Sequence, residues 1–72
     1  MGNEISKAKE SNAEAYLWLR QYEKQGRPDY LDKAIKKFRK AVEIAPLEDP
    51  KRGEYLMDLG TWLGARYEIT ED

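Results

Sequence analysis

The chain has 72 residues, of which 40% are apolar and 38% charged, and its formal net charge is −1. This length allows one domain, residues 1–72, and the near-neutral balance excludes strong global attraction to nucleic acid or acidic membranes. Without cysteine there is no disulfide or thiolate metal site, and without histidine the commonest acid–base group and metal ligand is missing. We expect no cofactor, no metal and no membrane span. The N-terminus does not resemble a signal peptide, and an intracellular location is favoured.

A first helix is predicted over about residues 4–25. Its inward positions alternate at steps of three and four residues, and Gly26 provides a stop because glycine adopts the left-handed conformation without a side-chain clash. The predicted seam consists of Ile5, Ala8, Asn12, Ala15, Leu19 and Tyr22, widened by Tyr16, Leu17 and Trp18.

The second helix, predicted over residues 28–45, has the clearest pattern. Pro28 fits a first helical turn, Asp29 and Asp32 place negative charge near the helix N-terminus, and Pro46 ends the helix. One continuous apolar stripe follows the helical period: Tyr30, Leu31, Ala34, Ile35, Phe38, Ala41, Val42 and Ala45. A basic stripe lies opposite: Lys33, Lys36, Lys37 and Lys40.

A third helix is predicted over about residues 50–69, with Asp49 as its N-cap. Gly60 and Gly64 lie four residues apart, and each costs roughly 1 kcal/mol of helix propensity relative to alanine. We therefore expect a neighbouring helix to approach them closely. The main apolar stripe is predicted as Leu56, Leu59, Leu63 and Tyr67, with Tyr55, Met57 and Trp62 beside it. Since the connections are short, the fold class is all-α, with three antiparallel helices.

The chain also matches itself at an offset of 45 positions, where residues 15–27 lie over residues 60–72. Ala15 then matches Gly60, and Tyr22 matches Tyr67. In the second helix, small residues, one large aromatic and a closing proline stand at the spacing of a tetratricopeptide repeat: Ala34, Phe38, Ala41 and Pro46. Residues 12–72 resemble a long-repeat subgroup of that family, with about one and a half repeats.

The resemblance implies a helical repeat fragment that acts as a protein–protein interaction module or scaffold. Each repeat buries its apolar face against neighbours, so the first and third helices are left with exposed apolar faces. A second copy of the chain, in a twofold homodimer, is the simplest partner that would bury these exposed faces. The residues predicted to mediate self-association are Tyr16, Trp18, Leu19, Trp62, Leu63 and Tyr67. An unrelated three-helix bundle, an excised piece of a longer array and a designed scaffold without a natural ligand stay open as alternatives.

In tetratricopeptide proteins, peptides dock on the concave face lined by the first helix of each repeat. The resemblance places six residues on that face: Lys9, Asn12, Tyr16, Arg20, Glu54 and Met57. The basic groups that would complete a grip on a peptide carboxylate are absent from the third helix, where Glu54 and Met57 stand instead. Ordinary exposed polar residues are the alternative interpretation.

Two further function classes are disfavoured. One is a nucleic-acid-binding helical module that uses the lysine stripe of the second helix. The stripe has the spacing of a phosphate-binding surface, but the net charge is negative and no aromatic residue interleaves with the lysines. Residues 28–45 carry five basic and three acidic groups, whereas residues 46–72 carry three basic and seven acidic groups. Two copies could therefore place the basic second helix of one near the acidic third segment of the other.

Catalysis is not expected, because the serine and threonine hydroxyls have no histidine to act as a base. Two pairs of carboxylates share a helix face, Glu10 with Glu14 and Glu54 with Asp58. These faces are expected to be solvated, so the pairs are not expected to act as acid–base catalysts.

Overall fold

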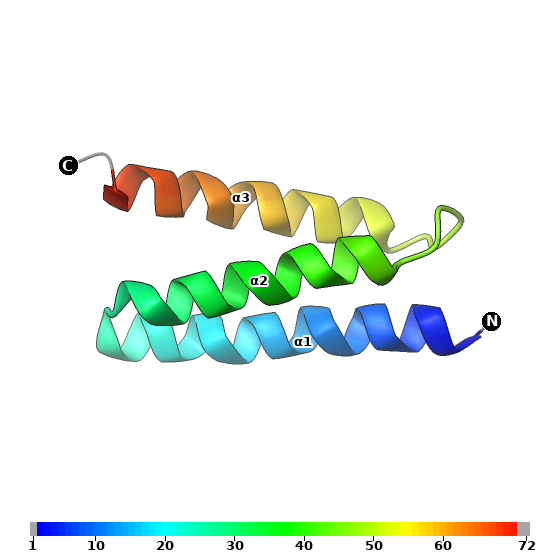
Figure 1. The fold of residues 1–72 in the computed structure, drawn as a ribbon, viewed down its shortest axis with the longest axis horizontal. Helices are drawn as coiled ribbons and strands as arrows, with labels where there is room; N and C mark the ends of the chain where they lie inside the picture. Colours follow the sequence, from blue (N-terminus) through cyan, green and yellow to red (C-terminus); the bar gives the residue numbers. More distant parts are fainter. Residues whose placement is uncertain (1, 71–72) are drawn as a thin grey trace.

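The computed structural model describes residues 2–70, and Figure 1 shows three helices in an elongated arrangement. They are α1 (Gly2–Gln25), α2 (Pro28–Ile44) and α3 (Arg52–Thr70), and no strand occurs within the described range. Neighbouring helices run antiparallel and α2 lies between the other two, so α1 and α3 point the same way (Figure 1). The predicted all-α class is confirmed. The predicted ranges differ from these bounds by two residues or fewer at each end.

In the α1–α2 connection, Gly26 follows the end of α1 and Pro28 begins α2. Gly26 adopts a positive φ of 68°, and its N–H donates to the Tyr22 carbonyl at 2.7 Å. That conformation is the one expected for a glycine that follows a helix. Arg27 is extended and Pro28 opens α2, where its missing N–H leaves no helical hydrogen bond unmade. The two helices are thereby joined closely enough to pack along their length.

The α2–α3 connection is organised by Asp49, which is only 4% exposed. Its Oδ1 accepts a 2.9 Å hydrogen bond from the Lys51 N–H, and its carbonyl accepts a 3.0 Å bond from the Arg52 N–H. A carboxylate bound to a backbone N–H two residues ahead is the geometry of an N-cap. Asp49 therefore caps the turn that leads into α3, although α3 itself begins at Arg52.

The core lies mainly between α1 and α2. Phe38 and Leu31 are the largest fully buried side chains, and burying one such side chain contributes roughly 1.5–3 kcal/mol. The Tyr16 ring meets the Phe38 ring edge-on, with centroids 5.2 Å apart. Ser11 is also buried, and its hydroxyl donates to the Lys37 carbonyl at 2.8 Å. The face of α1 that receives α2 is built mostly from small residues: Ala8, Ser11, Ala15 and Leu19.

One side of helix α3 faces the core. Its inward residues are Tyr55, Leu59, Trp62 and Ile69. Of the predicted main stripe, Leu59 packs inward, whereas Leu56, Leu63 and Tyr67 are exposed. Within the chain no helix approaches the two mid-helix glycines: a Cβ added to Gly60 or Gly64 would meet no atom within 4 Å. Since α3 carries apolar residues on both sides, periodicity alone did not determine which side faces α2.

Candidate functional site

The residues predicted to mediate self-association fall into two groups. Leu19 is buried in the core between α1 and α2, so the prediction that it is accessible to a partner is wrong. Trp62 is half-buried and packs against the same core. Leu63 and Tyr67 are exposed on α3. Tyr16 remains partly exposed beside Phe38, at the edge of a groove between α1 and α3.

Trp18 is engaged within the chain. Its ring stacks on the Tyr30 ring with centroids 5.9 Å apart and an interplanar angle of 15°. The ammonium group of Lys33 lies 4.6 Å from the centroid of the Trp18 ring, which is within cation–π range. The indole therefore joins α1 to α2 and is only half-exposed, so α1 contributes little apolar surface at this position.

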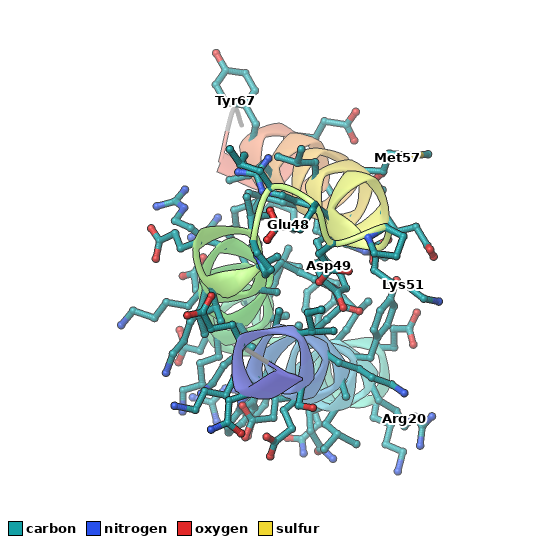
Figure 2. All side chains as sticks on the ribbon, turned by 90° about the vertical axis from the view of Figure 1, so that its right-hand side faces the viewer. Arg20, Glu48, Asp49, Lys51, Met57 and Tyr67 are labelled. Atoms are coloured by element: carbon teal, nitrogen blue, oxygen red, sulfur yellow. The ribbon has the colours of Figure 1, made fainter. Side chains whose placement is uncertain are left out.

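The largest exposed apolar surface lies on α3, on the side away from α2. Leu56 is 45% exposed, Met57 73%, Leu63 38% and Tyr67 67%. In Figure 2 the labelled side chains of Met57 and Tyr67 project from α3 away from the other helices. We call this surface the outer face of α3; it comprises Gly53, Leu56, Met57, Gly60, Leu63, Gly64 and Tyr67.

The seven residues of the outer face of α3 are uncharged, but exposed Glu68 lies one turn after Gly64 and borders this face on the side of Met57. Two charged side chains of the helix are directed toward its neighbours: Asp58 accepts a 3.4 Å hydrogen bond from the Asn12 amide, and Arg66 makes two hydrogen bonds to the Asp32 carboxylate. That carboxylate raises the pKa of the Arg66 guanidinium. The usual arrangement, with charges outward and apolar residues inward, is thus partly reversed on α3.

A groove of about 440 Å³ separates α1 from α3 on one side of the molecule. Five of the six predicted peptide-binding residues line it: Lys9, Asn12, Tyr16, Arg20 and Glu54. The sixth, Met57, lies on the outer face of α3, so its assignment to the groove is wrong. Asp58 and Lys51 line the groove too, and the sequence analysis did not single out either one.

The groove has a basic α1 wall and a largely acidic α3 wall. Lys9 and Arg20 stand on α1, whereas Glu54 and Asp58 stand on α3. Lys51 is basic, but its ammonium pairs with Glu54 at 3.6 Å. Partial burial first, and then a hydrogen bond to Asp58 and the negative charges nearby, raise the pKa of the Tyr16 hydroxyl. The two walls therefore partly neutralise each other and form no single-sign clamp for a carboxylate.

The lysine stripe of α2 is partly engaged inside the chain. Lys33 covers the Trp18 ring, and Lys37 pairs with Glu14 at 3.3 Å. The two remaining lysines, Lys36 and Lys40, are exposed. Acidic residues share this exposed side of α2: Asp29, Asp32 and Glu43. The outward surface of α2 is therefore of mixed sign, which weakens it as a phosphate-binding surface.

Within residues 2–70 no cluster of three or more potential metal ligands is present. None of the described helices is long and apolar enough to cross a membrane. Comparison with family models, curated proteins and solved structures found no match to this chain. The resemblance to tetratricopeptide repeats accordingly stays a prediction from the sequence.

Proposed function

We propose that this chain is a protein-interaction module of the tetratricopeptide kind that self-associates through the outer face of α3. The observation that supports the proposal is an exposed helix face that is mostly apolar, with one charged residue, Glu68, at its edge. A helix that is apolar on both sides is normally buried on both sides, and exposed apolar patches mark interaction surfaces. The inner side of α3 packs on the chain's own core, which leaves the outer side for a partner.

A second copy of the chain fits this surface. In a twofold dimer the same patch lies on both sides of the interface, so a mostly apolar face can meet its own copy, with Glu68 as the charge at its edge. The four large exposed residues of the outer face offer roughly 450 Å² per copy, taking about 200 Å² for each when fully exposed. Two copies would bury about 900 Å², which is below the roughly 1,200 Å² of a stable specific interface and in the range of weak, transient contacts. We therefore expect a dimer with a dissociation constant on the order of micromolar or weaker.

The substitution Met57→Lys tests the proposal, because Met57 is 73% exposed and its replacement leaves the chain's own core intact. Twofold symmetry would place two new charges in the interface, and the dissociation constant should rise at least about tenfold. Leu17→Lys is the matched control, since Leu17 is 60% exposed on α1. Sedimentation velocity over a concentration series would measure both, with helicity checked by circular dichroism.

The proposal predicts that the native chain and the Leu17→Lys variant dimerise alike, whereas Met57→Lys dimerises at least about tenfold more weakly. Equal association of both variants would place the contact elsewhere on the molecule. A native chain that never associates would refute self-association altogether.

A further inference from the structure

We draw no further inference here: the strongest candidate, the groove between α1 and α3 lined by Lys9, Arg20, Glu54 and Asp58, belongs to the site already described, and its walls of opposite charge select no single class of ligand.

Discussion

Replacing both mid-helix glycines of α3 with alanine should change stability and association in opposite directions. Neither Gly60 nor Gly64 has an atom within 4 Å of the position of an added Cβ, so alanine meets no obstacle in the monomer. Alanine is better than glycine in a helix by about 1 kcal/mol per site, so the double variant should gain about 2 kcal/mol in the free energy of unfolding. For a domain of this size that gain corresponds to roughly 8–16 °C in melting temperature.

In the proposed dimer the same two methyl groups lie on the outer face of α3, inside the interface. They push the backbones apart, and overpacking of this kind costs about 1–3 kcal/mol. We therefore expect the dissociation constant to rise about tenfold while the monomer becomes more stable. Thermal melts at low concentration and sedimentation at high concentration measure the two effects separately. A less stable monomer would refute the open environment of the glycines, and unchanged association would refute their place in the interface.

Two further predictions concern the monomer. Asp49→Ala removes the side-chain cap of the turn into α3 and should lower the free energy of unfolding by about 0.5–2 kcal/mol, measured by urea denaturation; no change would contradict the capping role. Burial, followed by the negative charges of Asp49 and Glu54, raises the pKa of Tyr55. The folded chain therefore favours the neutral phenol, and this contribution to stability is complete below about pH 10 and is lost as the pH rises through the folded pKa. Tyr55→Phe should flatten the alkaline loss seen in melts between pH 9 and 11, and an unchanged slope would contradict this assignment.

The sequence was sufficient for the helices and their ends, because those depend on local signals. The period of the α2 stripe, the left-handed Gly26 and the short connections each have a local physical cause, and the structure shows all three. The side of α3 that faces α2, by contrast, is not determined by local sequence signals. The apolar residues of α3 surround the helix, so periodicity leaves its facing open, and the contacts of Tyr55 and Trp62 with the core show which side is inward.

The candidate sites were also only partly predictable from the sequence. Five of the residues that the family resemblance implied line the groove, whereas the sixth, Met57, is exposed on the outer face of α3. The engagement of Trp18 depends on Tyr30 and Lys33, which lie on another helix at positions that periodicity does not relate to α1. Contacts between helices of this kind need coordinates.

Sedimentation equilibrium of the native chain, from about 1 μM to about 1 mM, tests self-association most directly, since micromolar dissociation constants fall in this range. The proposed role of the outer face of α3 predicts a mass that rises with concentration from 8.4 kDa toward twice that value. A mass that stays at 8.4 kDa up to the highest concentration would contradict it.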